Sequence, residues 1–206
     1  MIPFVELQRV ATELGEAPFL VRYPDPALLV YDPAKAHAGD HDTHRTEAGT
    51  QAFSRSRASD WLSKTEGSDW LSKTYEDMSV LDPQPDLPLD VCFVRKSPGS
   101  SNPFPNLISL GRMRSNDVVL STTVVSKVHA AILVDPPGRD GRRTYQLRDQ
   151  NSTNGTFVEG VRLAADQRHP LRDGVGIGFG GLRLRFVHAP TLYRALRDPG
   201  LLDQLG

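Results

Sequence analysis

Residues 110–157 decide the fold; they read LGRMRSNDVVLSTTVVSKVHAAILVDPPGRDGRRTYQLRDQNSTNGTF. Short apolar runs alternate here and just upstream with Gly, Pro, Asn and Asp, which end each run after a few residues. This pattern is typical of the strands of a small antiparallel β domain. The runs are residues 107–110, 118–120, 130–134 and 144–147. We therefore predict a mostly β chain whose main domain is an antiparallel β-sandwich.

Three polar motifs lie between these runs: Gly111-Arg112, Ser126-Lys127-Val128-His129, and Asn151-Ser152-Thr153-Asn154-Gly155-Thr156. They fall at strand ends or in loops, where a rigid sandwich presents its binding groups. A guanidinium, two hydroxyls and an Asn amide suit an anion that is attached to a peptide backbone. The motifs therefore predict a binding site rather than a structural feature.

Composition narrows the class of protein. No window of the 206 residues approaches 18 consecutive apolar residues, which predicts no membrane span. No basic segment followed by an apolar core opens the chain, so we expect no secretory signal. Cys92 is the only cysteine, which excludes an internal disulfide and favours a reducing, cytoplasmic location.

The charge is unevenly distributed along the chain. Residues 1–85 carry 8 Lys and Arg against 14 Asp and Glu, whereas residues 86–206 carry 16 against 11. A moderately basic second half suits an anionic partner, but its charge density is well below that of a nucleic-acid binder. Two solvated surfaces of unlike sign would explain the numbers equally well.

We expect four segments along the chain. Residues 1–34 predict a small α-β-β unit, with a helix that ends at Gly15 and strands at 19–23 and 27–31. This unit is too small to hold a core alone, so it either packs on the main domain or docks another molecule. Residues 87–190 form the sandwich, from a strand at 89–94, where Cys92 packs as a small apolar residue, to an alternating strand at 182–186. Residues 191–206 predict a helical tail interrupted by Pro199-Gly200.

Residues 35–86 are rich in polar residues, which predicts a disordered linker. Within it, residues 59–65 (SDWLSKT) recur as residues 68–74, and both tryptophans of the chain lie in this repeat. The repeat is either an aromatic anchor for an interface or a duplication in a tolerant linker. His37, His41 and His44 match no closed zinc pattern, so we expect no metal site.

The three motifs, in their order and at their spacing, resemble those of the forkhead-associated (FHA) domain, a β-sandwich that binds phosphothreonine. Asn116-Asp117, Asp173-Gly174 and Ile177-Gly178 fit the same pattern. The resemblance covers about residues 87–190, half of the chain, and leaves the first 86 residues outside.

The resemblance implies a role for each motif residue. Arg112, Ser126 and Thr153 would face the phosphate, and Lys127 would add a point charge beside it. Asn154 would hydrogen-bond the peptide main chain. Gly111 and Gly155 would allow tight loops, and His129 would tie the recognition loops together without touching the ligand. In the family, the position held here by Val124 often helps to read the third residue after the phosphothreonine, which argues against an acidic residue there.

Other functions fit the sequence less well. Ser126 and His129 suggest a hydrolase pair, but no acid and no nucleophile elbow accompany them. Gly176-x-Gly178-x-x-Gly181 matches a dinucleotide fingerprint, yet a strand follows it instead of a helix. We therefore expect no catalysis and no cofactor. The alternative that stays open is a scaffold that binds proteins independently of phosphate through the sandwich or the N-terminal unit.

The expected partner is a phosphothreonine-containing protein, produced by a Ser/Thr kinase, and neither a nucleic acid nor a membrane. The chain itself offers a candidate ligand in Thr74, which Tyr75-Glu76-Asp77 follows in the acidic linker. Tethering would raise the effective concentration of such a ligand to about the millimolar range.

Overall fold

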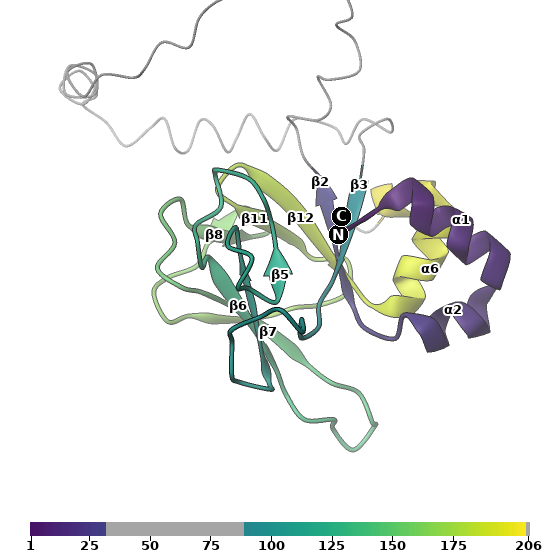
Figure 1. Ribbon diagram of the computed structural model, residues 1–206, viewed down its shortest axis with the longest axis horizontal. Helices are drawn as coiled ribbons and strands as arrows, with labels where there is room; N and C mark the ends of the chain where they lie inside the picture. Colours follow the sequence, from purple (N-terminus) through teal and green to yellow (C-terminus); the bar gives the residue numbers. More distant parts are fainter. Residues whose placement is uncertain (32–88, 205–206) are drawn as a thin grey trace, which may run out of the picture. The chain divides into compact units, whose positions relative to one another are not determined.

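Two β-sheets pack face to face in the computed structural model, which describes residues 1–31 and 89–204 (Figure 1). One sheet has seven strands in the order β1-β3-β2-β12-β11-β8-β9, and the other has five in the order β10-β7-β6-β4-β5. All pairings are antiparallel except that of β4 with β5. The predicted mostly β sandwich is confirmed.

The strands of the seven-stranded sheet come from both ends of the chain. They are β1 (Ile2–Pro3), β2 (Ala27–Tyr31), β3 (Leu89–Phe93), β8 (Thr156–Val158), β9 (Val161–Arg162), β11 (Gly176–Phe179) and β12 (Leu182–Val187). The five-stranded sheet contains β4 (Leu107–Gly111), β5 (Val118–Val119), β6 (Ala130–Val134), β7 (Tyr145–Asp149) and β10 (Arg168–Pro170).

Side chains that alternate along the strands pack into two separate cores, one on each face of the seven-stranded sheet. On β12, Leu182, Leu184 and Phe186 face the space between the sheets, where they pack with residues of β4, β6 and β11. Arg183 and Arg185 alternate with them on the outer face. Cys92 is buried in the inner core, as predicted for a small apolar residue.

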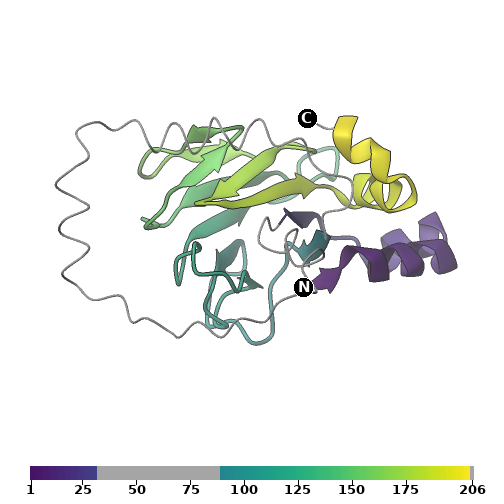
Figure 2. The ribbon, with the colours of Figure 1, turned by 90° about the horizontal axis from the view of Figure 1, so that it is seen from above.

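Helices pack on the outer face of the seven-stranded sheet where β2, β3 and β12 lie (Figure 2). They are α1 (Phe4–Leu14), α2 (Glu16–Arg22) and α6 (Ala189–Arg197), and a 3-10 turn (Pro199–Gln204) follows α6. Leu7 and Leu192 are completely buried against Leu29 and Val91 of the sheet, and the Gln8 side chain donates to the carbonyl oxygen of Leu196, 3.1 Å away. The N-terminal and C-terminal helices thus form one layer.

The first 31 residues differ from the predicted α-β-β unit. Residues 19–23 were expected to be a strand, but residues 16–22 are the helix α2, with Phe19 buried and Val21 82% exposed. The expected strand at 27–31 is present, and it lies between β3 and β12. The helix predicted to end at Gly15 is α1, and the C-terminal segment contains α6, which begins at Ala189, and the 3-10 turn.

Other predictions lie outside the described residues. These are the linker at 35–86, its tryptophan repeat, the three histidines and Thr74. Within residues 1–31 and 89–204, no helix is long and apolar enough to cross a membrane.

Because β2 lies inside the seven-stranded sheet, we expect the N-terminal segment to be necessary for folding. Ala27, Leu28, Leu29 and Val30 are all buried, and each large side chain contributes about 1.5–3 kcal/mol, a sum comparable to the whole stability of a domain. We predict that residues 86–206 alone show no cooperative urea transition by circular dichroism.

The matched control keeps β2 and shortens the connection. Because Tyr31 and Leu89 lie directly opposite each other, a short Gly-Ser turn in place of residues 35–85 should preserve a cooperative transition. A stable, cooperative fragment of residues 86–206 would show that β2 is dispensable.

Candidate functional site

The loop after β4 lies against the loop before β6. The backbone N–H of Arg112 donates to the carbonyl oxygen of Ser126 at 3.0 Å, and that of Met113 donates to the carbonyl oxygen of Lys127 at 3.2 Å. Gly111 permits this approach, because a Cβ on it would lie 2.4 Å from the Lys127 carbonyl oxygen. The Arg112 side chain is exposed, and within the described part of the chain it forms no ion pair with a carboxylate.

Two hydroxyls that are distant in sequence meet beside this loop. The backbone N–H of Thr153 donates to the Ser126 Oγ at 2.9 Å, and the Ser126 hydroxyl lies 3.3 Å from the Thr153 hydroxyl. Lys127 and Thr153 are exposed, and Ser126 is half-buried. The structure therefore gathers Arg112, Ser126, Lys127 and Thr153 at one end of the sandwich.

A buried histidine joins the two loops. The backbone N–H of Ser126 donates to Nδ1 of His129 at 3.0 Å, so Nε2 carries the ring proton and donates to the carbonyl oxygen of Gly155 at 3.2 Å. The ring also stacks on Phe179, with 4.5 Å between centroids. Burial lowers the pKa of His129, which keeps the imidazole neutral. Both ring nitrogens are thus occupied by main-chain groups, and neither contacts the Ser126 hydroxyl.

Asn154 connects the third motif to the segment before Ser126. Its Nδ2 donates to the carbonyl oxygen of Val124 at 2.9 Å, and its Cβ lies next to Gly180, in the turn between β11 and β12. Gly180 has a φ of 58°, and an added Cβ would lie 2.9 Å from that of Asn154. This close approach requires glycine and fixes the turn beneath the Asn154 side chain.

Buried polar residues that the motifs do not reveal support these loops. Asn116 donates from Nδ2 to the carbonyl oxygens of Met113 (2.9 Å) and Lys127 (2.8 Å). The Asp117 carboxylate accepts from the backbone N–H and hydroxyl of Ser109, at 2.9 and 3.0 Å, and from Asn102 Nδ2 at 2.7 Å. In the sequence, Asn116-Asp117 stand out only as a pair that fits the motif pattern of the family.

The Asp149 carboxylate holds the loop that contains the third motif. Its carboxylate accepts from the Ser152 backbone N–H (2.9 Å), the Ser152 hydroxyl (2.6 Å) and the Thr156 hydroxyl (2.6 Å). Burial alone would raise the pKa of Asp149, but these hydrogen bonds outweigh it and hold the pKa below its usual range. For Asp117, burial is likewise outweighed by the hydrogen bonds, and the pKa lies well below its usual range. Both carboxylates are therefore charged anchors at neutral pH.

Arg162 is a further cation that the sequence analysis missed. It belongs to the edge strand β9, and its side chain extends to Gly155, where an added Cβ would lie 2.7 Å from Nε. Nothing in the sequence separates it from the other exposed arginines of the second half.

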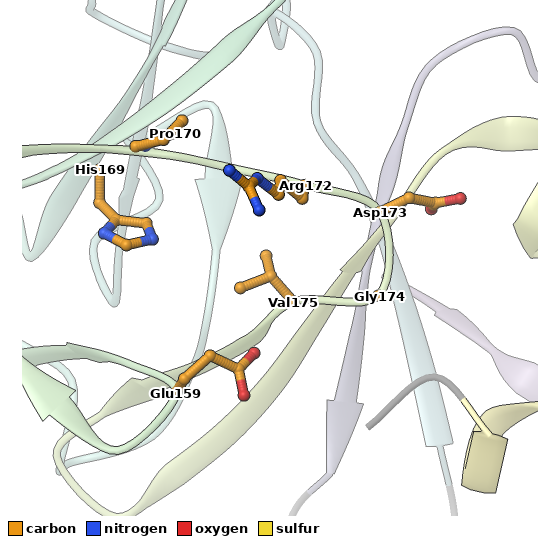
Figure 3. A pocket seen from close by; sticks show the side chains of 7 residues that line it. All are labelled: Glu159, His169, Pro170, Arg172, Asp173, Gly174 and Val175. Atoms are coloured by element: carbon orange, nitrogen blue, oxygen red, sulfur yellow. The ribbon is translucent and has the colours of Figure 1, made fainter.

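A separate open pocket of about 430 Å³ lies at the other end of β8 and β11 (Figure 3). Glu159, His169, Arg172 and Val175 surround it, while the Asp173 side chain points away to hydrogen-bond the His188 backbone and the Thr191 hydroxyl. None of the predicted site residues lines this pocket.

The comparisons with known proteins identify the sandwich. Residues 108–180 match the family model of the FHA domain, which confirms the resemblance: the chain contains an FHA domain. The ABC transporter ATP-binding/permease protein Rv1747 of Mycobacterium tuberculosis is 34% identical over 99 residues, which are 48% of this chain and 10% of Rv1747. The match thus spans about a tenth of that relative.

The solved structures that the chain matches include several determined with partner molecules, three of which follow. Mycobacterium tuberculosis EmbR in complex with a low-affinity phosphopeptide has a TM-score of 0.34 and 27% identity, over 41% of this chain and 20% of that chain. The FhaA FHA domain complexed with the intracellular domain of Rv3910 has a TM-score of 0.36 and 27% identity, over 47% and 87%. The yeast Dun1 FHA domain with a doubly phosphorylated peptide derived from Rad53 has a TM-score of 0.45 and 20% identity, over 82% and 77%.

The neutral, buried His129 makes the stability of the site depend on pH. In the unfolded chain the imidazole takes up a proton near its ordinary pKa of 6.5, but in the folded chain it does so only at lower pH. The unfolded state therefore binds more protons in this interval, and the free energy of unfolding should fall as the pH drops below about 6.5. Urea midpoints measured from pH 8 to pH 5 should show this decline.

The contribution of His129 can be isolated from that of other groups. His129→Asn should flatten the decline, whereas His169→Gln, at a half-buried histidine far from the motifs, should retain it. If His129→Asn does not fold, the imidazole of the parent protein can be titrated by NMR. An ordinary or raised pKa of His129 would contradict the prediction.

Proposed function

We propose that this chain is a non-catalytic adaptor that binds a phosphothreonine-containing protein downstream of a Ser/Thr kinase. One observation carries the proposal: an exposed arginine with no carboxylate partner in the described residues lies on the loop that contacts the Ser126 loop, and the Ser126 hydroxyl meets that of Thr153 from a third loop.

The chemistry of phosphothreonine suits these groups. The phosphate carries close to two negative charges and three acceptor oxygens at neutral pH. The Arg112 guanidinium can bind two of those oxygens at once, while Lys127 adds a point charge and the Ser126 and Thr153 hydroxyls add neutral donors. Asn154 uses one Nδ2 proton on Val124, which leaves its carbonyl oxygen to accept a peptide N–H.

The rigid support of the loops favours binding. The Ser126 and Gly155 main chain is fixed by His129, and Lys127 by Asn116, before any ligand arrives. A site of this kind needs little ordering on association, which reduces the free-energy cost of binding. The proposed ligand therefore meets hydroxyl and main-chain groups that are already in position.

Arg112→Ala tests the proposal directly. A hydrogen bond to a charged group contributes about 1.5–3 kcal/mol, so we expect the variant to bind phosphothreonine peptides at least about tenfold more weakly. Fluorescence polarisation with a phosphothreonine peptide library would measure the loss. The matched control is Arg114→Ala, which removes an exposed arginine from the same loop.

Two outcomes would contradict the proposal. Equal binding by Arg112→Ala and the parent protein would remove Arg112 from the site. Equal affinity of the parent protein for phosphorylated and unphosphorylated peptides would favour the alternative, a scaffold that binds independently of phosphate.

The chain's own Thr74 is the ligand that we propose for regulation. The connection of residues 32–88 starts after Tyr31, which pairs with Arg183 near the β11–β12 turn and hence near Asn154. Thr74 lies 15 residues before Leu89, a reach of up to about 50 Å. Strands β2 and β8 are three strand spacings apart, which is about 15 Å. Because the reach of the connection exceeds this distance, it supports binding within one molecule.

Phosphorylation of Thr74 should therefore lower the affinity for an added phosphopeptide. We expect the protein phosphorylated at Thr74 to bind a labelled phosphothreonine peptide more weakly than the unphosphorylated protein, because the tethered residue competes. Thr74→Ala, treated with the same kinase, is the control. Equal peptide affinity with and without phosphate on Thr74 would exclude this regulation.

A further inference from the structure

The edge strand β9 contains an arginine that lies beside the proposed peptide site. Arg162 lies opposite Phe157 of β8, on the outer face of the seven-stranded sheet. Its side chain leaves that face and reaches Gly155, where an added Cβ would lie 2.7 Å from Nε and 3.1 Å from both Cζ and Nη2. The guanidinium therefore lies against the main chain of the third recognition motif.

The three consecutive residues of that motif face different parts of the site. The Thr153 backbone N–H binds the Ser126 hydroxyl, the Asn154 side chain binds the Val124 carbonyl, and Gly155 contacts Arg162. The Gly155 carbonyl is held by His129 Nε2 at 3.2 Å and by the Gly180 backbone N–H at 3.1 Å. Arg162 is thus next to a fixed segment, whereas Arg112 and Lys127 belong to the loops of the other sheet.

The charge of Arg162 is available for a ligand. Its side chain is exposed, and in residues 1–31 and 89–204 it forms no ion pair and no hydrogen bond with a carboxylate. Glu159, at the other end of β8, accepts a hydrogen bond from the Gly176 backbone N–H. The Asp149 carboxylate is saturated by Ser152 and Thr156.

We propose that Arg162 is a specificity-determining residue that selects an Asp or Glu side chain close to the phosphothreonine of the ligand. This proposal rests on the proposed function, because it needs the phosphate to be bound at Arg112. With the phosphate at Arg112 and the peptide main chain at Asn154, a neighbouring side chain passes Gly155 and meets the guanidinium. A planar guanidinium binds a carboxylate through two parallel hydrogen bonds.

The acidic linker contains a segment with this chemistry. Glu76 and Asp77 follow Thr74 at the second and third positions, and no basic residue lies between Lys73 and Arg95. The side chain of Val124, which the resemblance assigns to the third position, is half-buried and apolar. We therefore expect a carboxylate near the phosphothreonine to pair with the Arg162 guanidinium. The apolar side chain of Val124 offers it no positive charge.

The test separates the acidic preference from phosphate binding. A neutral phosphothreonine peptide is compared, by fluorescence polarisation with the full chain, with peptides that carry a single Asp at each position flanking the phosphothreonine. We expect the parent protein to bind one or two of these peptides about two- to fivefold more tightly at low salt, as for an exposed ion pair. Arg162→Gln should abolish this gain and leave the affinity for the neutral peptide unchanged.

Arg168→Gln is the matched control, because it removes an exposed arginine of equal charge from β10 of the other sheet. It should retain the gain, and the parent protein should lose the gain at high salt. A gain that survives Arg162→Gln, no gain in the parent protein, or an equal loss for neutral and acidic peptides would overturn the assignment of Arg162. The proposed function would stand in those cases as long as the neutral peptide binds only when phosphorylated. If phosphorylation had no effect, both proposals would fail.

Discussion

Two of the proposed recognition loops depend on one imidazole ring that is completely buried. His129 accepts the Ser126 backbone N–H on one nitrogen and donates to the Gly155 carbonyl from the other, so a single planar group sets the distance between two loops. The ring can do this only while it is neutral, since a second ring proton would face the Ser126 N–H. Burial lowers its pKa and secures that state. The Ser126 and Thr153 hydroxyls converge on the two loops that this ring joins.

The side chains of the candidate site differ from the residues that support them. The side chains that we propose to meet a ligand are exposed or half-buried, whereas the groups that hold them are buried and hydrogen-bonded. Asn116 and Asp117 fix the segment after Arg112, and Asp149 folds the loop that presents Thr153. Carboxylates at these supporting positions are charged at neutral pH because hydrogen bonds compensate for their desolvation. Rigid support of this kind is what a binding loop on a sandwich requires.

The sequence predicted those features whose signal is local. Gly and Pro punctuation marked β4, β6 and β12, and the order of the motifs identified the family. Residues 19–23 were misassigned because a short apolar run fits a strand or a helix equally, and Pro18, in the first turn of α2, does not interrupt that helix. Strand β10 was missed because Arg-His-Pro has no apolar alternation. The partners of Asp117 and Arg162 lie on other elements, so no spacing along the chain could reveal them.

The central position of β2 has a consequence for how the protein is made. Arg183 of β12 pairs with Tyr31 of β2, so the two neighbouring strands are separated by about 150 residues of chain. During translation β2 leaves the ribosome long before β12 has been synthesised. The apolar residues of β2 therefore remain exposed during that time. Strand β2 can pair with β12 only after residues 182–187 have been synthesised, so an apolar segment remains without its sheet neighbour while about 150 residues are added.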